Sequence, residues 1–305
     1  MSLDGVYPVA QAQAGLVNLR QISDAGLSRQ QLRTSLRRGD IQRVLRGVYM
    51  VPEWAATDFD ARRARAAWAG SLASAPNGIS TGACALHLHG IQGLPQRLTP
   101  EVARANGRHF SGVQGVRVRQ FTRPFDVWRF GEWRVAAPVP AFVQALPEMS
   151  VDRAVAALDS GMNRNVITPV EVDEIRRRLR GRRGVVALDP CWALVDGRAG
   201  SPIETKVRLE CVREGVPPTD LQVVLRERGG AFIARGDLGW RRGDGTWVLA
   251  EVDGYDVHSA PEALFHDRSR QNRIMLHGRH TPLRFTSRDL GTGRIAAQVR
   301  EALRL

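Results

Sequence analysis

The sequence predicts an α/β protein, α+β overall, built from three successive parts. A helix–turn–helix pattern followed by β-type alternation occupies residues 1–55, and helical and strand-like runs mix from 56 to 197. An α-β-β-β-α-β-α order then fills residues 198–305. A chain of 305 residues is long enough for two or three domains that each bury a core. We therefore predict domain boundaries near residues 55 and 197.

The composition is that of an ordinary globular protein. Hydrophobic residues make up 43% and charged residues 25%, and no apolar run reaches the roughly 18 residues of a membrane span. The first residues, MSLDGVYPVA, lack the basic and apolar regions of a secretory signal, so we expect a cytoplasmic protein with no membrane partner. Cys84, Cys191 and Cys211 form no CxxC pair, which argues against a zinc site or a disulfide framework.

The net charge is large and positive. It amounts to +13, and nearly all of the basic residues are arginines because Lys206 is the only lysine. A basic protein attracts polyanions and gains free energy by releasing their condensed counterions. Nucleic acid is therefore the leading partner that the composition indicates.

The first part follows the order helix, turn, helix, wing. In LRQISDAGLSRQQLRTSLRRGDIQRVLRGVYMVP, a short helical pattern ends at a turn around Gly26. Ser28 is placed to cap a second helix. β-type alternation around Val44 and Val48 follows that helix. This order predicts a winged helix over residues 1–55.

The outer face of the second helix and the wing carry side chains that suit phosphates and base edges. They are Arg29, Gln30, Arg33, Thr34, Arg37, Arg38, Arg43 and Arg46. The first fifty residues hold seven arginines against three aspartates, so the basic bias is local as well as global. We predict that this segment binds double-stranded DNA. The alternative is a solvated helical face on a small structural subdomain.

The stretch GLSRQQLRTSLRRGDIQRVLRGVYMVP resembles the N-terminal winged-helix domain of AbiEi-type antitoxins. The recurring pattern there is a short helix, GLS, a second helix and R-G-x-I-x-R-V-x-R-G-V-Y, and the likeness covers roughly 35 residues. In that family the domain binds operator DNA. The resemblance implies the same capacity here, and with it a cognate toxin as a further partner.

The middle part contains two stretches that bear on function. His87 and His89 are two apart on an expected helix, so they face different directions and do not predict a shared metal. The run RRRLRGRRG belongs to a helix that begins with Thr168 as its cap and Pro169 at its first position. This run fits contact with a DNA backbone and a solvated basic helix end equally well.

The last part begins with SPIETKVRLECVREG, a helix that Ser201 caps. Three strand-like runs follow, LQVVLRER, AFIARGDLGW and TWVLAEVDGYDV, and Asp244 with Gly245 marks the turn between the last two. A helix from about Pro261 to His277, the strand TPLRFTS and a final helix complete the order.

Acidic residues of this last part fall where they can gather. Asp237 and Glu251 lie on adjacent strands of the expected hairpin, and Glu204 can supply a third carboxylate from the preceding helix. Asp253 shares the face of Glu251, because residues two apart on a strand point the same way. Crowded carboxylates repel one another unless they are protonated or bridged by a cation. We therefore predict Mg²⁺ or Mn²⁺ held by Glu204, Asp237 and Glu251, with a water activated to attack a phosphodiester.

These positions resemble the PD-(D/E)xK nuclease superfamily. SPIETKVRLECVREG, ARGDLGW, AEVDGYDVH, DRSRQNRIMLHG and LRFTSRDL look more closely like the endonuclease-like domains related to very-short-patch repair endonucleases. The resemblance implies a restriction-endonuclease-like fold with a central sheet. The catalytic positions that it implies are Glu204, Asp237, Glu251, Asp253 and His258. Asp253 stands where the wider superfamily has the lysine that positions the attacking water, so we expect His258 to act as the general base.

Competing hypotheses remain at this point. The first is a DNA-binding protein with a metal-dependent nuclease domain, and the second is a transcriptional repressor or antitoxin whose nuclease fold survives only as a scaffold. A protein-interaction module of a defence system fits the winged-helix pattern least. Structural roles are also open to the acids, since Glu204 can complete a capping box with Ser201 and Asp237 can close a turn. The tripeptide from Glu204 to Lys206 is itself ExK, but a capped helix turns its two side chains apart.

Overall fold

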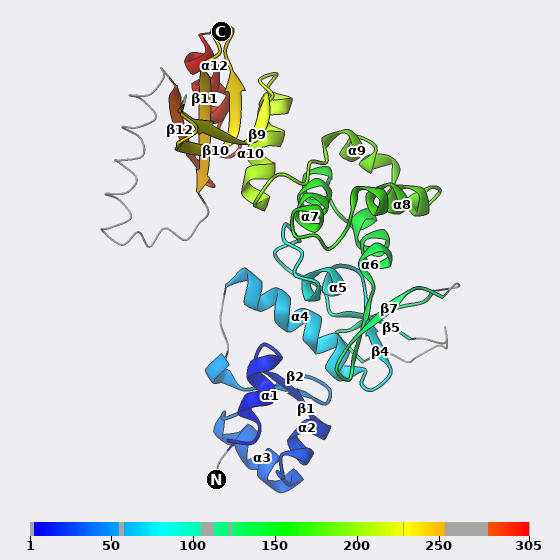
Figure 1. The fold of residues 1–305 in the computed structure, drawn as a ribbon. Coiled ribbons are helices and arrows are strands. Elements are labelled where there is room, and N and C mark those ends of the chain that lie inside the picture. The colour runs from blue at the N-terminus through cyan, green and yellow to red at the C-terminus, as the bar shows by residue number, and fades with distance from the viewer. Residues whose placement is uncertain are drawn as a thin grey trace. The chain divides into compact units, whose positions relative to one another are not determined.

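The computed structural model describes residues 3–54, 58–104, 113–121, 124–227, 229–253 and 280–304 (Figure 1). The chain forms two compact units. The first comprises Met1–Met149 with Val166–Val186, and the second comprises Ser150–Asn165 with Ala187–Leu305. Helices and sheets occur in both units, which confirms the predicted α/β class. The division into three parts at residues 55 and 197 stays a prediction.

The N-terminal segment of the first unit is a winged helix. Its elements are α1 (Tyr7–Ala12), β1 (Leu16–Asn18), α2 (Leu19–Asp24), α3 (Arg29–Arg38), β2 (Gln42–Leu45), β3 (Val48–Met50) and the 3₁₀ turn η1 (Pro52–Trp54). The three strands form an antiparallel sheet in the order β1-β3-β2. Ile22, Leu32 and Ile41 pack together in the core of this segment. The predicted order of helix, turn, helix and wing is confirmed.

Both ends of α3 are set by residues of its own sequence. At its start the backbone N–H of Gln31 donates to Ser28 Oγ at 3.3 Å, and the N–H of Ser28 donates to Gln31 Oε1 at 2.7 Å. These two bonds form a capping box. At its end Gly39 has a φ of +81°, which residues with a Cβ rarely adopt. The helix that carries the candidate DNA contacts therefore has fixed bounds.

The rest of the first unit is built on a mixed five-stranded sheet in the order β6-β5-β4-β8-β7. Its elements are α4 (Phe59–Ala73), β4 (Gly78–Ser80), α5 (Gly82–Leu88), β5 (Glu101–Arg104), β6 (Arg117–Arg119), β7 (Val127–Phe130), β8 (Trp133–Ala136), α6 (Pro138–Ala145), η2 (Leu146–Glu148) and α8 (Pro169–Leu179). Every residue of α6 is buried, and this helix packs against both α5 and α8. Thr168 caps α8 in a capping box with Glu171, as predicted.

The two histidines near the end of α5 are held by packing. His89 Nε2 forms a hydrogen bond with the carbonyl of Ala136 at 2.8 Å. Its ring lies edge-on to Trp128 and Phe130, with centroids 5.1 Å and 5.9 Å away. Burial lowers the pKa of both His87 and His89. Each histidine is therefore favoured in its neutral form.

The second unit is an α/β domain on a four-stranded sheet in the order β12-β11-β10-β9. Its elements are α7 (Val151–Asn163), α9 (Cys191–Leu194), α10 (Pro202–Arg213), β9 (Asp220–Arg226), β10 (Phe232–Arg241), β11 (Trp247–Asp253), β12 (Thr281–Thr286) and α12 (Arg294–Leu303), and η3 (Val186–Leu188) lies where the two units meet along the chain. Strands β9 to β11 are antiparallel, and β12 runs parallel to β11. The predicted order is confirmed for these elements, whereas the predicted helix from Pro261 to His277 lies outside the described residues.

The core of the second unit lies between its sheet and the helices α10 and α12 (Figure 1). Val207 and Cys211 of α10 and Ile295 of α12 pack there against Leu238 and Ala250 of the sheet. The helix α7 packs on α10 from the same unit. No helix among the described residues is long and apolar enough to cross a membrane.

Candidate nucleic-acid interface and carboxylate cluster

Exposed cations cover the outer side of α3 and the wing. They are Arg29, Arg33, Arg37 and Arg38 on α3, and Arg43 and Arg46 on the wing. Among the described residues, none of these six arginines forms an ion pair, and Arg37 makes only a side-chain bond of 3.4 Å to Thr34 Oγ1. Gln30 is exposed beside them, and its carbonyl accepts a hydrogen bond from Thr34 Oγ1 at 3.1 Å. The six arginines and Gln30 are thus exposed, and none of these arginines is in an ion pair within the described part of the chain.

The orientation of this surface follows from the core on the opposite side of α3. Leu32 is 5% exposed, and Leu36 packs on the same cluster one turn later. Because this apolar face is buried, the arginines at positions 29, 33 and 37 must turn outward. Val44 on the wing is 43% exposed, although its place in the alternation does not indicate this. It adds an apolar contact point between the arginines of the wing.

In the second unit, the structure brings Glu204 and Asp237 together. The side-chain amide of Gln222 lies between them: its Nε2 donates to Glu204 Oε2 at 2.9 Å and to Asp237 Oδ1 at 3.5 Å. Two backbone N–H groups also donate to these carboxylates: that of Gly200 to Glu204 Oε2 at 2.8 Å, and that of Val252 to Asp237 Oδ2 at 2.9 Å. Burial, and then the charge of Asp237, raise the pKa of Glu204. The two acids therefore form the crowded pair that the sequence predicts.

Neither Glu204 nor Asp237 has the structural role that the sequence left open for it. Ser201 does cap α10, since its Oγ accepts from the N–H of Glu204 at 3.3 Å. The Glu204 carboxylate does not complete a capping box, because it turns to Gly200 and Gln222 instead. Asp237 lies inside β10 and closes no turn. Glu204 is buried and Lys206 is exposed, so the two ends of the ExK tripeptide lie in different surroundings, as expected for a capped helix.

Gln222 was missed by the sequence reasoning. It lies in β9 between Leu221 and Val223, which pair with Leu238 and Gly236 on β10, so it stands opposite Asp237. Its φ is +51°, a left-handed conformation that costs a non-glycine residue roughly 1–2 kcal/mol. Nothing in the sequence separates it from an ordinary polar residue of an alternating strand.

Glu251 and Asp253 share one face of β11, as predicted. Ala250 and Val252 pack into the core under the helices, so the alternation of the strand places the two acids on the opposite face. On the neighbouring strand, Arg284 is paired in register with Glu251 and forms an ion pair with Asp253. Its hydrogen bond to Asp253, with the charges of both acids, raises the pKa of Arg284.

The predicted metal ligands are therefore gathered in part. Within the described residues, no group of three or more His, Cys, Asp and Glu side chains is placed to hold a metal ion. Glu204 and Asp237 are together, and the charge of Glu251 acts on Arg284 of the neighbouring strand. His258 lies outside the described residues. The three-carboxylate site and its general base stay predictions.

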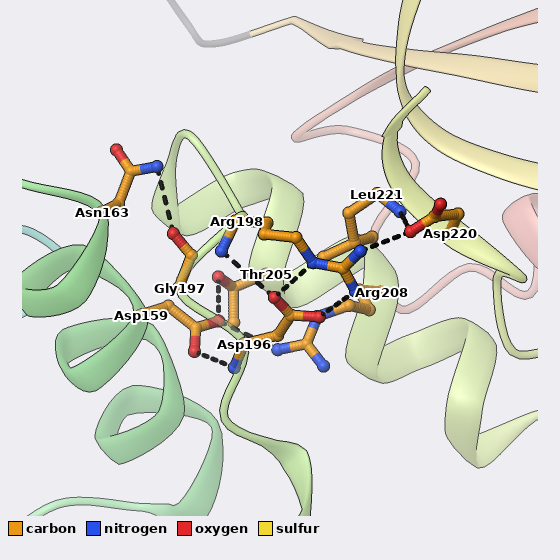
Figure 2. A network of polar contacts seen from close by, with 9 residues as sticks. All are labelled: Asp159, Asn163, Asp196, Gly197, Arg198, Thr205, Arg208, Asp220 and Leu221. Carbon is orange, nitrogen blue, oxygen red and sulfur yellow. Dashed lines mark hydrogen bonds and ion pairs between the residues drawn. The ribbon is translucent and has the colours of Figure 1, made fainter. Parts of the chain in front are cut away.

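A buried polar network holds the segments that carry this cluster (Figure 2). Asp159 of α7 is 1% exposed, and its Oδ2 accepts from Thr205 Oγ1 and from Arg208 Nη2, each at 2.9 Å. Its Oδ1 accepts from the N–H of Asp196 at 2.7 Å. Burial raises the pKa of Asp159 to about 6, although Arg208 and the hydrogen bonds act to lower it.

The network continues to the edge of the sheet. Arg198 bonds to the carboxylate of Asp196 and forms an ion pair with Asp220 at the start of β9 (Figure 2). Asp159 thereby joins α7, the loop before α10 and the helix itself, and Arg198 links that loop to β9. These are the elements that carry Glu204 and Gln222, so the network positions both.

A helix–turn–helix with a β wing, whose outer helix carries exposed arginines, defines the winged-helix class of DNA-binding domains. Residues 6–52 match the family described as "Transcriptional regulator, AbiEi antitoxin". The matched segment runs from the start of α1 into η1 and so covers the whole winged helix. The N-terminal resemblance is confirmed, while the resemblance of the second unit to endonucleases stays a prediction.

Two relatives come from Mycobacterium tuberculosis. They are "Uncharacterized protein MT2308" of strain CDC 1551 / Oshkosh and "Uncharacterized protein Rv2248" of strain ATCC 25618 / H37Rv. Each is 28% identical over 138 residues, which is 45% of this chain and 49% of the relative. The chain thus covers about half the length of these curated relatives.

Proposed function

We propose that the protein is a transcriptional regulator that binds double-stranded DNA through its winged helix. The observation that carries this proposal is the outward surface of α3 and the wing, where exposed arginines have no ion-pair partner among the described residues. Arginines placed in this way neutralise phosphates and release counterions, and their planar guanidinium groups can bind base edges in pairs of hydrogen bonds. The match of residues 6–52 to a family of regulators supports the same function.

In this proposal α3 enters the major groove and the wing follows the backbone beside it. Arg33 and Arg37 are one turn apart on the outer side of α3, and Arg43 lies in the first strand of the wing, β2. Together these three side chains span both contact regions. Val44 offers an apolar surface of the kind that contacts sugars or a thymine methyl group.

The test is the affinity for operator-length duplex DNA, measured by fluorescence anisotropy over a series of salt concentrations. The triple variant Arg33→Ala, Arg37→Ala, Arg43→Ala is expected to bind more weakly, and its log–log salt slope should be shallower by up to about one unit per lost phosphate contact. The matched control removes three exposed arginines of the second unit, Arg226, Arg241 and Arg288. Equal losses in the two variants would refute the assignment of binding to the winged helix.

An antitoxin role follows from the same likeness. In this role the chain represses its own operator and acts together with a cognate toxin as its partner. The test is co-expression with the protein encoded next to it, with cell growth as the readout. Growth arrest by that protein alone, relieved by this chain, would support the role, and relief by an unrelated DNA-binding protein would contradict it.

A second function, metal-dependent hydrolysis of DNA, is favoured by the convergence of Glu204 and Asp237 on Gln222. Two carboxylates and an amide can supply hard oxygen ligands of the type that Mg²⁺ or Mn²⁺ prefers. Burial and then the nearby charge of Asp237 raise the pKa of Glu204, and a bound cation would offset both effects. A bound cation would polarise the scissile phosphate. Glu204 and Asp237 would hold it, with Glu251 as the third ligand and Gln222 turning its carbonyl oxygen inward.

The remaining residues would act on the water and the substrate. Asp253, in the position of the missing lysine, is bound to Arg284, so this strand pair presents a guanidinium near the acids. His258 remains the proposed general base. Plasmid nicking with Mg²⁺ or Mn²⁺ tests this function, and we expect slow nicking that Asp237→Asn abolishes. A wild-type protein that never nicks DNA would leave the second unit as a scaffold of the regulator.

A further inference from the structure

A hollow of about 370 Å³ lies in the first unit, on the part that follows the winged helix. It is lined by Arg119, Gln120, Phe121, Gln144 and Arg182. Its size falls within the range of small-molecule sites, about 300–1,000 Å³. None of the side chains that line it is acidic, and all of the charged ones are cationic. This composition favours an anionic ligand.

Gln144 supplies a side-chain hydrogen-bond donor to this hollow. The side chain is 5% exposed, and its Oε1 accepts from the N–H of Gly82 at 2.9 Å. That bond identifies the oxygen end of the amide, so the other end is the NH₂ group. Among the described residues, no acceptor meets this NH₂ group. The NH₂ group can therefore donate a hydrogen bond to an acceptor that is bound in the hollow.

The two arginines contribute differently. Arg119 Nε donates to Glu101 at 2.8 Å and its Nη2 donates to Glu148 at 2.8 Å, which leaves Nη1 without a partner among the described residues. These carboxylates balance the charge of Arg119 and fix its position. Arg182 is exposed and, within the part of the chain that the structure describes, has no ion pair. The net positive charge of the hollow therefore comes from Arg182.

Glycines place Arg182 beside α6. Gly181 and Gly184 have φ values of +76° and +86°, and a Cβ on Gly184 would lie 2.8 Å from the carbonyl oxygen of Pro147. The turn that carries Arg182 thus lies against η2, immediately after the helix that carries Gln144. This turn belongs to the RRRLRGRRG run, which the winged-helix function leaves unexplained.

Phe121 gives the hollow an aromatic wall. Its ring is half-buried and lies at 65° to that of Phe125, with the centroids 4.7 Å apart. Aromatic rings beside arginines are how proteins hold a base next to its phosphate. We propose that this hollow binds a nucleotide phosphate, with the phosphate on Arg182, Gln144 and Arg119 and the base against Phe121. The ligand is either a free nucleotide or a nucleotide of single-stranded nucleic acid.

The experiment is a thermal-shift titration of the full chain with four probes: inorganic phosphate, AMP, ADP and a 5′-phosphorylated deoxyadenosine trinucleotide. It is carried out in the Arg33→Ala, Arg37→Ala, Arg43→Ala background, so that the winged helix does not contribute. A ligand that binds the folded state alone raises Tm by mass action. The test variants are Arg182→Gln and Gln144→Glu, the second of which keeps the acceptor for Gly82 and replaces the NH₂ donor by a carboxylate. Arg178→Gln is the control, because Arg178 pairs with Glu174 and does not line the hollow.

We expect AMP, ADP or the trinucleotide to raise Tm in the background protein and in Arg178→Gln. Either test variant should weaken binding at least tenfold. Tighter binding of AMP or ADP than of the trinucleotide identifies a free nucleotide as the ligand, and the reverse order identifies single-stranded nucleic acid. Inorganic phosphate binding as tightly as AMP would overturn the role of Phe121 and the nucleotide assignment. The absence of any shift at millimolar concentrations, or equal shifts in all variants, would overturn the site.

Discussion

The substitution Arg208→Met tests the buried polar network that positions Glu204 and Gln222. The ion pair of Arg208 with Asp159 is almost fully buried, with side chains 9% and 1% exposed. Methionine keeps much of the volume of the arginine stem but leaves the Asp159 carboxylate without its cation. Removing one partner of a buried ion pair costs about 3–5 kcal/mol, because the other charge stays buried and uncompensated. We expect the second unit to lose this much stability near pH 8.

The cost should depend on pH, and its sign follows from Asp159. Burial raises the pKa of Asp159 to about 6 from an ordinary value of 3.8, so the folded state binds this proton more tightly than the unfolded state does. The stability that the protonated Asp159 contributes to the folded state is present at low pH. It is lost as the pH rises through about 6, by about 3 kcal/mol at most. Loss of Arg208 raises this pKa further. The destabilisation by Arg208→Met should therefore be smaller at pH 5 than at pH 8.

The assay is urea unfolding followed by circular dichroism at pH 5 and pH 8, with the transition of the second unit fitted by itself. Arg213→Met is the matched control on the same helix. Its ion pair with Asp152 is exposed, with side chains 57% and 37% accessible, so we expect a loss of about 1 kcal/mol or less at either pH. Equal losses for the two variants at pH 8, or no pH dependence for Arg208→Met, would refute the structural role assigned to the network.

Three further predictions concern the cap, the acids and the general base. Ser28→Ala removes the capping box of α3 and should destabilise the winged helix by about 0.5–2 kcal/mol in thermal melts. The control Ser23→Ala replaces an exposed serine that caps no helix, and it should leave the stability unchanged. Glu204→Gln removes the repulsion between Glu204 and Asp237, so Tm without metal should rise at pH 8. The increase in Tm that Mg²⁺ or Mn²⁺ gives the wild type should disappear in this variant. An unchanged increase in Tm with metal argues against the site. If the second unit nicks DNA, His258→Ala should nick far more slowly than the wild type, and equal rates would remove His258 as the base while leaving the metal ligands in place.

Local signals predicted the elements of the fold well. Ser28, Thr168 and Ser201 each cap the helix that the sequence assigns to them, because a capping side chain acts within three residues of its own position. The hairpin that carries Asp237 and Glu251 follows from alternation and from the turn at Gly245. Strand order then places Asp237 near the preceding helix, so the approach of Glu204 and Asp237 was predictable.

Tertiary partners were not predictable from the sequence. Asp159 lies on α7, far along the chain from Arg208, and no local pattern reports that bond. Gln222 enters the cluster with a positive φ that no residue pattern indicates, and Arg284 reaches Asp253 through the parallel register of β11 and β12. Val44 is exposed, whereas the next residue of the wing, Leu45, packs against a core cluster that includes Ala69 and Leu72 of α4. Each of these depends on packing between elements that are distant in sequence.

The central claim, that α3 lies on DNA, is most directly tested by cleavage of DNA from a tethered iron–EDTA group. Cys84, Cys191 and Cys211 are all buried, so a cysteine placed at the exposed position of Gln30 accepts the label selectively. The control carries the label at Glu301→Cys on α12 of the second unit, which is also exposed. We predict that the Gln30→Cys conjugate cuts a bound operator duplex at one or two sites with the spacing of the major groove, and that the control does not reproduce these cuts. Uniform or absent cleavage from Gln30→Cys on DNA that the protein demonstrably binds would contradict the claim.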